Sequence, residues 1–150
     1  MKLSSTAFSE GALIPAQYTC TGDDSSPPLT WSAIPASAQS LALIADDPDA
    51  PVGTWVHWVA FNLSVTAGGL PEGIKDAKRL PGGGMQGTNS WRRTGYGGPC
   101  PPSGTHRYFF KLYALDTTLS LDKDATAKDL QAAMKGHILA QTQLMGRFKR

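Results

Sequence analysis

Two apolar segments near the middle of the chain carry the pattern expected of β-strands. The first, "SLALIAD" (Ser40 to Asp46), is short and apolar without interruption, which is typical of a strand buried on both faces. The second, "WVHWVAFNL" (Trp55 to Leu63), is apolar on both faces except for one histidine, His57. Strand alternation puts His57 on one face with Trp55, Val59 and Phe61, and leaves Val56, Trp58 and Ala60 on the other. Coverage of both faces predicts a strand in the middle of a two-layer structure.

A third strand is predicted for "HRYFFKLYALD" (His106 to Asp116), where alternation places His106 and Tyr108 on the same face. The connection between the second and third strands, Ser64 to Thr105, is rich in glycine and proline. It is far longer than the roughly 4–6 residues of a usual connection. Long irregular segments in compact domains are usually functional or carry small local elements, and we expect one of these here.

One helix is predicted near the C-terminus. Thr126 is a candidate N-cap with Asp129 three residues later, and Leu130 and Met134 follow at helical spacing before a Lys-Gly ending. The next segment, "HILAQTQLMG" (His137 to Gly146), is interpreted as a second helix or as a continuation of the first.

Length and composition favour a single domain, residues 1–150, of mainly β class, because the 16 glycines and 11 prolines suit many turns between short strands. The formal net charge is +2 with scattered basic residues, which does not indicate nucleic-acid binding. The N-terminus has no continuous apolar export segment, and no apolar run approaches the roughly 18 residues of a membrane span. A cytoplasmic protein is therefore expected.

The two cysteines, Cys20 in "YTCTGDD" and Cys100 in "GGPCPPSG", are too few for a disulfide scaffold and lack CxxC spacing. Two independent thiols are the simpler interpretation. Both cysteines lie in turn-rich loops, however, so a contact between the two loops is the alternative. A count of free thiols in the non-reduced protein separates the two.

His57 and His106 are the candidate functional side chains, although a histidine on an apolar strand is more often a structural core residue. A functional role gains weight because aspartates precede the first histidine and Tyr108 shares a face with the second. A metal site would combine both histidines with aspartates, but their spacing matches no recognised ligand pattern. A hydrolase would need an activated nucleophile, and Ser103 has only its nearness in sequence to His106 in its favour.

Binding of an anion or zwitterion suits the same residues better. Imidazole and phenol donors, with backbone N–H groups of a Gly/Pro loop, can hold a phosphate, while ionised aspartates would orient the imidazoles or pair with a ligand amine. Nucleotide binding through the GxGxxG pattern in "PGGGMQG" is not expected, because no strand precedes it and no helix follows it.

The motifs "DDPDAP", "WVHW" and "GYGGPCPPSGTHRYFFKLYALD" resemble the phosphatidylethanolamine-binding protein family, also called the Raf kinase inhibitor protein family, in its bacterial and archaeal branch. The resemblance extends from "YTCTGDDSSPPLTW" to "GHILAQTQLMGRF". It implies two antiparallel sheets packed as a Greek-key-like sandwich with small peripheral helices near the C-terminus. It also implies a non-enzymatic protein with no cofactor or metal, whose pocket binds phosphate and phospholipid head groups. Carried over residue by residue, that pocket is lined by Asp47, Asp49, His57, Gly98, Pro101, His106 and Tyr108.

The resemblance further implies a homodimer. The chain departs from the family in two places: it ends after "GRFKR" without the longer C-terminal segment of animal members, and Asn89-Ser90 stands where relatives often have Asn-Asp. Kinase regulation is therefore not expected to carry over directly. The alternative function is inhibition of a protein target, a protease or kinase, through the surface loop from Gly82 to Arg93. In that case His57→Ala would leave inhibition intact.

Overall fold

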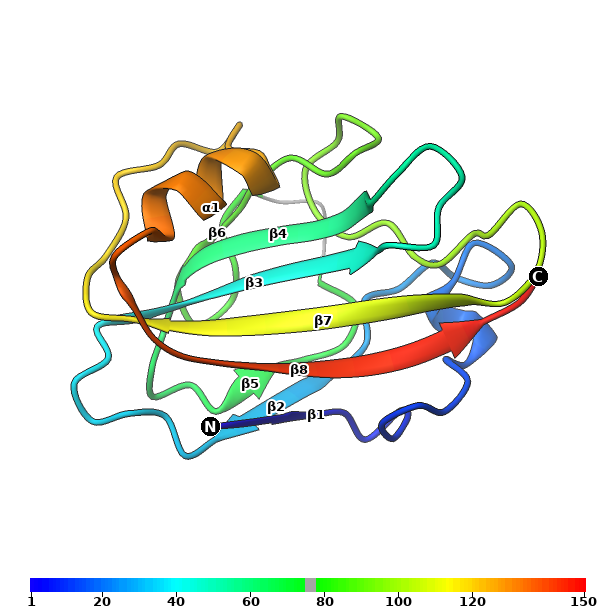
Figure 1. Cartoon of the computed structure of the whole chain (residues 1–150). Coiled ribbons are helices and arrows are strands. Elements are labelled where there is room, and N and C mark those ends of the chain that lie inside the picture. The colour runs from blue at the N-terminus through cyan, green and yellow to red at the C-terminus, as the bar shows by residue number, and fades with distance from the viewer. Residues whose placement is uncertain (75–77) are drawn as a thin grey trace.

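Two antiparallel β-sheets form the body of the fold, which we describe from a computed structural model covering residues 1–74 and 78–150 (Figure 1). The smaller sheet has the order β1-β2-β5 and the larger has the order β6-β4-β3-β7-β8. The strands are β1 (Lys2–Ser4), β2 (Leu29–Ser32), β3 (Ser40–Asp47), β4 (Trp55–Leu63), β5 (Gly69–Leu70), β6 (Met85–Gln86), β7 (His106–Leu115) and β8 (Ile138–Phe148). A 3-10 helix, η1 (Ala16–Tyr18), and one α-helix, α1 (Ala127–Met134), complete the described elements. The expected two-sheet, mainly β fold is confirmed.

The centre of the larger sheet is β3, and every one of its residues is buried. Side chains such as Leu43 and Phe110 pack between the two sheets, whereas Ile44 and Phe61 pack on the opposite face under α1. Burial on both faces explains the uninterrupted apolar sequence of β3. The predicted strands for residues 40–46, 55–63 and 106–116 therefore match β3, β4 and β7 closely.

The pairing of β3 with β4 shifts by one residue next to His57. Ala45 pairs with Trp58 while Asp46 pairs with Val56, so His57 is an extra residue on β4. Such a bulge re-aims a side chain. As a result His57 faces the same side of the sheet as Tyr108. Val59 and Phe61 lie on the opposite face, under α1, so the expected grouping of His57 with them is wrong.

Helix α1 begins as predicted. The Thr126 side chain accepts a hydrogen bond from the Asp129 backbone N–H, and the Asp129 carboxylate accepts one from the Thr126 N–H, which forms a capping box. Leu130 and Met134 are buried against the outer face of the larger sheet, where α1 lies over β4 (Figure 1). The helix is therefore held by its cap and by one apolar stripe.

The predicted second helix over residues 137–146 is wrong, because this segment is the edge strand β8, paired with β7 over its whole length. Long-range pairing overrides the helix propensity of its Leu, Ala, Gln and Met residues. The outer edge of β8 is covered in part by a segment near the N-terminus. There, Gly11 and Ile14 donate backbone hydrogen bonds to the carbonyls of Met145 and Arg147.

The long connection between β4 and β7 contains small local elements, as predicted: β5 and β6 lie within it. Gly82, Gly83 and Gly84 all have φ between 83° and 107°, a region that favours glycine, and they form the tight turn before β6. The Gly82–Gly87 motif is therefore a turn that enters a two-residue strand.

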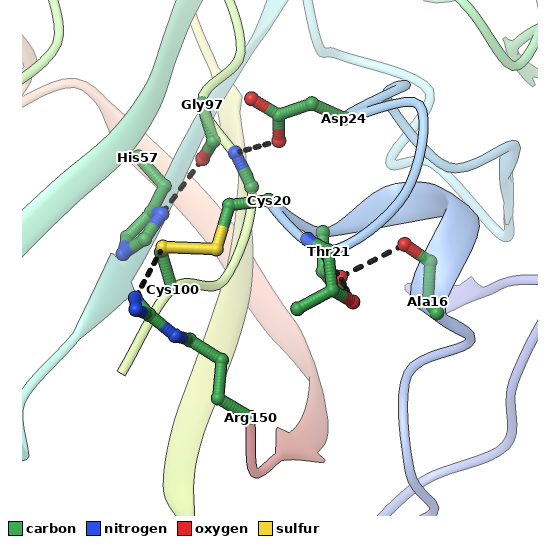
Figure 2. Close-up of a disulfide and its surroundings, with 10 residues drawn as sticks. Ala16, Cys20, Thr21, Asp24, His57, Gly97, Cys100 and Arg150 are labelled. Atoms are coloured by element: carbon green, nitrogen blue, oxygen red, sulfur yellow. Dashed lines mark hydrogen bonds between the residues drawn. A yellow bond between two sulfur atoms is a disulfide. The ribbon is translucent and has the colours of Figure 1, made fainter. Parts of the chain in front are cut away.

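Cys20 and Cys100 form a disulfide, so the expectation of two independent thiols is wrong and the loop-to-loop alternative holds. The bridge joins the loop after η1 to the loop before β7, at a sequence separation of 80 residues. Figure 2 shows this bridge beside His57, with the guanidinium of Arg150 donating to the Cys100 sulfur at 3.3 Å. Both linked loops contribute to the cavity described below.

Candidate functional site

A cavity of about 330 Å³ lies where β3 ends, β4 begins and β7 begins. Because these three strands are antiparallel neighbours, those ends meet at the same edge of the sheet. Its lining residues come from four stretches of the chain: Cys20, Asp24, Asp47, Ala50, Pro51, Val52, Trp55, His57, Trp91, Arg93, Gly98, Cys100, Pro101, Pro102, His106 and Tyr108. Six of the seven residues expected at the site therefore share one cavity. The seventh, Asp49, is not among the described residues that line it.

His57 is fixed in one tautomer by the loop before β7. Its Nδ1 lies 2.7 Å from the carbonyl oxygen of Gly97, and because a carbonyl only accepts, Nδ1 carries the proton (Figure 2). The ring is also held edge to face between Trp91 and Tyr108, with centroids 5.0 and 5.2 Å away. Burial lowers the pKa of His57, outweighing the neighbouring Gly97 carbonyl and Asp47 carboxylate, which favour the charged ring.

The second histidine has a carboxylate partner. Nδ1 of His106 donates to Oδ2 of Asp47 at 2.6 Å, and both side chains are buried. The other oxygen of Asp47 accepts a hydrogen bond from the Asp49 backbone N–H at 2.8 Å. Asp47 thus fixes the orientation of His106, as the sequence predicted, by holding Nδ1 of the ring.

Asp49 serves a different partner from the one expected. Its carboxylate receives hydrogen bonds from the Nε, Nη2 and backbone N–H groups of Arg107, at 2.8–2.9 Å. This pairing lowers the pKa of Asp49 to about 2. Asp49 therefore ties the loop between β3 and β4 to the start of β7, which keeps that loop beside the cavity.

Tyr108 contributes a buried hydroxyl that makes no hydrogen bond to any of the described residues. The residue is 2% exposed and lines the cavity. Burial, followed by the charge of Asp47, raises the pKa of Tyr108 and outweighs the nearby Cys100 backbone N–H, so the hydroxyl stays protonated. A buried, unpartnered donor is costly to the folded chain, and a ligand acceptor in the cavity would satisfy it.

Gly98 belongs to the site because two loops approach each other closely there. Its N–H donates to Oδ1 of Asp24 at 2.8 Å, and an added Cβ would lie 2.4 Å from both Asp24 Oδ1 and the Tyr18 carbonyl. Cys20 N–H donates to the Pro99 carbonyl in the same contact. Hydrogen bonds and the disulfide together hold these loops, and Pro101 lines the cavity from the loop that leads into β7.

The aromatic and cationic rim of the cavity was not predicted from the sequence. Trp55 and Trp91 line the cavity with their rings edge to face at 5.5 Å, and the guanidinium of Arg93 lies 5.8 Å from the Trp91 ring centroid. The side-chain oxygen of Asn89 accepts backbone hydrogen bonds from Trp91 and Arg93, which shapes the loop. The "NSWRR" sequence held the signal, because tryptophan and arginine together in a loop are common at binding sites.

The alternative chemistries gain no support from the described residues. Ser103 is exposed and is not among the described residues that line the cavity. No group of three or more histidine, cysteine, aspartate or glutamate residues within residues 1–74 and 78–150 is arranged to hold a metal ion.

Among the helices described for this chain, none has the length and apolar character needed to cross a bilayer.

The two-sheet fold and its cavity define a β-protein with a ligand-sized site at one end of the larger sheet. The sequence matches the model of the phosphatidylethanolamine-binding protein family over residues 4–149. The chain therefore belongs to that family, as its motifs predicted.

Similar proteins occur in archaea and in bacteria. The chain is 52% identical over 150 residues to a UPF0098 protein of Methanothermobacter thermautotrophicus, covering 100% of this chain and 99% of the relative. A UPF0098 protein of Chlamydia pneumoniae is 45% identical over 155 residues, with 100% and 99% covered.

Two crystal structures share the whole fold. A phosphatidylethanolamine-binding protein homologue from Chlamydia trachomatis has a TM-score of 0.92 at 43% identity, covering 99% of this chain and 96% of the other. YbcL of Escherichia coli, described as a new member of the mammalian family, has a TM-score of 0.92 at 29% identity, with 99% and 98% covered.

Proposed function

We propose that the protein binds small molecules that carry a phosphate group, without turning them over. The observation that carries this proposal is the buried Tyr108 hydroxyl, which has no partner among the described residues and lines one cavity with His57 and His106. Each histidine has its Nδ1 engaged by the protein, so Nε2 is the nitrogen left for a ligand. Arg93 adds a positive charge at the rim.

The charges of the site fit a small anion better than a cation. The two carboxylates that line the cavity already have partners within the protein, because Asp47 is paired with His106 and Asp24 accepts a hydrogen bond from the Gly98 N–H. An anion at Nε2 of a protonated His106 would meet a donor, with the Asp47 carboxylate balancing the ring's charge from the other side. The family name supports a phosphate-bearing head group as the ligand class.

The proposal is tested by titrating phosphoethanolamine while the NMR signals of His57 and His106 are followed. Both signals should shift and saturate together, because both rings line the same cavity. The exposed His137, which is hydrogen-bonded to Asp116 outside the cavity, should not shift and serves as an internal control. If His57 and His106 remain unchanged up to high millimolar ligand, the proposal fails.

Tyr108→Phe separates binding from folding. The hydroxyl makes no hydrogen bond to any described residue, so its removal should leave stability unchanged or slightly increased. Loss of one hydrogen bond to a charged ligand costs about 1.5–3 kcal/mol, so affinity for phosphoethanolamine should fall roughly tenfold or more. Urea denaturation and calorimetric titration measure the two effects. Unchanged affinity in a stable variant would exclude a role for this donor.

A further inference from the structure

The two histidines of the cavity have different electrostatic environments. His106 has a carboxylate on its Nδ1, 2.6 Å away, whereas His57 has the neutral carbonyl of Gly97 on its Nδ1, 2.7 Å away. A carboxylate can balance the charge of an imidazolium fully, and a single carbonyl dipole cannot. Two histidines in one cavity are therefore suited to opposite roles, one as a donor and one as an acceptor.

The role of His57 follows from its tautomer. Its Nδ1 must hold a proton to donate to Gly97, so in the neutral ring Nε2 carries a lone pair and accepts. His57 is 4% exposed and lies edge to face between two aromatic rings, which solvate a charge poorly. Burial lowers the pKa of His57 accordingly, so the neutral form is favoured near pH 7.

The charged and titratable groups around His57 support this assignment from several elements. Five of them line the cavity with His57 and the sixth, Asp46, lies on β3: Asp24, Asp46, Asp47, Arg93, His106 and Tyr108. Asp47 is held by His106 and Asp46 by Lys111, while Asp24 accepts from Gly98. The Tyr108 hydroxyl remains a donor. The cavity thus offers a donor from Tyr108 and an acceptor from His57, and His106 donates from Nε2 only when its ring is charged.

We infer that the site selects phosphate groups that carry a proton, that is, phosphate monoesters, over phosphodiesters, because His57 offers them an acceptor. This inference rests on the proposed function. A phosphate monoester has a second pKa near 6, so near neutral pH it has a P–OH form that can donate to Nε2 while its other oxygens accept. A phosphodiester has no such proton. Its oxygen would face the lone pair of Nε2 and leave a buried acceptor unsatisfied.

The consequence concerns the class of ligand. An intact phospholipid carries its head group as a phosphodiester, whereas a free phosphorylated amine, alcohol or sugar carries a monoester. The chemistry of His57 favours the second group. A site built to accept a hydrogen bond from a ligand O–H strongly rejects analogues that lack this proton. The preference therefore favours soluble phosphate monoesters over lipid head groups still attached to their lipid.

The test compares three small probes at pH 6 by calorimetric titration of the whole protein: methyl phosphate, methyl sulfate and dimethyl phosphate. About half of the methyl phosphate then carries both one negative charge and one proton. Methyl sulfate has nearly the same shape and one charge without the proton, and dimethyl phosphate is the corresponding diester. Methyl phosphate should bind about tenfold more tightly than either, the cost of one unsatisfied buried acceptor.

Two variants make the test specific. His57→Asn places an amide near the position of Nδ1, so it can still donate to Gly97, but it removes Nε2. Its preference for methyl phosphate over methyl sulfate should fall to near unity. His137→Asn, at an exposed histidine outside the cavity, should retain the full preference. Two results would overturn the assignment of His57 as the acceptor. One is that His137→Asn loses the preference for methyl phosphate, and the other is that a folded His57→Asn keeps it.

The outcomes for the wild-type protein separate the two proposals. If methyl sulfate or dimethyl phosphate binds within about threefold of methyl phosphate, the preference is wrong and the anion site stands. If none of the three probes binds, the proposed function itself is wrong. The preference should also narrow as the pH falls below the pKa of His57 measured by NMR, because protonation turns Nε2 into a donor.

Discussion

Removing the Cys20–Cys100 bridge should destabilise the whole domain. The change is the double variant Cys20→Ser, Cys100→Ser, in which each serine is close in size to the cysteine it replaces. The two cysteines are 80 positions apart in sequence and close a segment that contains β2 to β6. The bridge therefore restricts more than half of the unfolded chain, and most of its effect comes from the unfolded state.

The magnitude follows from the length of the closed segment. For a sequence separation of 80 residues, the chain-entropy relation gives about 4.5 kcal/mol at 25 °C. Backbone hydrogen bonds across the same loop contact remain in the variant, including Cys20 N–H to Pro99 and Gly98 N–H to Asp24. We therefore expect the free energy of unfolding to fall by about 2–4.5 kcal/mol and the melting temperature by roughly 5–15 °C.

The assay is urea denaturation of the wild type and the variant, each with and without reductant. Reductant should lower the stability of the wild type to that of the variant and leave the variant unchanged. The number of titratable thiols in the non-reduced, unfolded wild type provides the control, and the bridge predicts none. Two reactive thiols, or a loss of stability below about 1 kcal/mol, would contradict the reasoning from loop length.

Three further predictions concern residues that stabilise the fold or the site: Asp49, Thr126 and Gly98. Stability should fall as the pH drops from about 4 towards 2, because Arg107 lowers the pKa of Asp49 to about 2 and the stabilisation is lost on protonation. The pair is partly exposed, so Asp49→Asn should cost only about 1 kcal/mol at pH 7 and remove most of this acid sensitivity in urea titrations. Thr126→Ala removes the N-cap of α1 and should cost about 1 kcal/mol by the same assay, whereas Thr126→Asn should restore most of it. Gly98→Ala forces a Cβ to within 2.4 Å of Asp24, so it should cost about 1–3 kcal/mol and weaken anion binding in calorimetry; an unchanged Kd would show that this close approach is not needed.

The elements that depend on local sequence could be predicted. The bounds of β4 match the predicted range, because its aromatic and β-branched residues are buried on both sides and turn residues flank it. The start of α1 was predicted because the capping residues are only three positions apart. In both cases the decisive contacts lie within a few residues, so the sequence pattern contains them.

The errors arise where distant segments decide the structure. The segment β8 has good helix formers, yet its pairing with β7 across an intervening helix makes it a strand. The predicted face of His57 was wrong because the bulge in β4 depends on the register of β4 against β3. A prediction from strict strand alternation takes no account of that register. The disulfide likewise depends on two loops that meet only in the folded chain.

The candidate site was predicted in part. Both histidines, Tyr108 and Asp47 share the cavity, because the ends of antiparallel neighbours meet. Asp49 lies beside the cavity, paired with Arg107. The homodimer and the cytoplasmic location stay predictions, and the bridge between Cys20 and Cys100 bears on the second because disulfides usually persist in oxidising compartments.

Because the cavity is assembled from four separated stretches of the chain, binding of a ligand can be measured as a rise in the stability of the folded protein. The cavity exists only when the loop after η1, the segment around the β3–β4 loop, the loop with Trp91 and Arg93, and the segment that leads into β7 are brought together, so the unfolded chain has no equivalent site. A compound that binds only the folded state adds about 2.7 kcal/mol of stability at one hundred times its Kd. For a chain of 150 residues this raises the melting temperature by roughly 5–10 °C. A collection of cellular phosphates could therefore be ranked by affinity from melting curves alone.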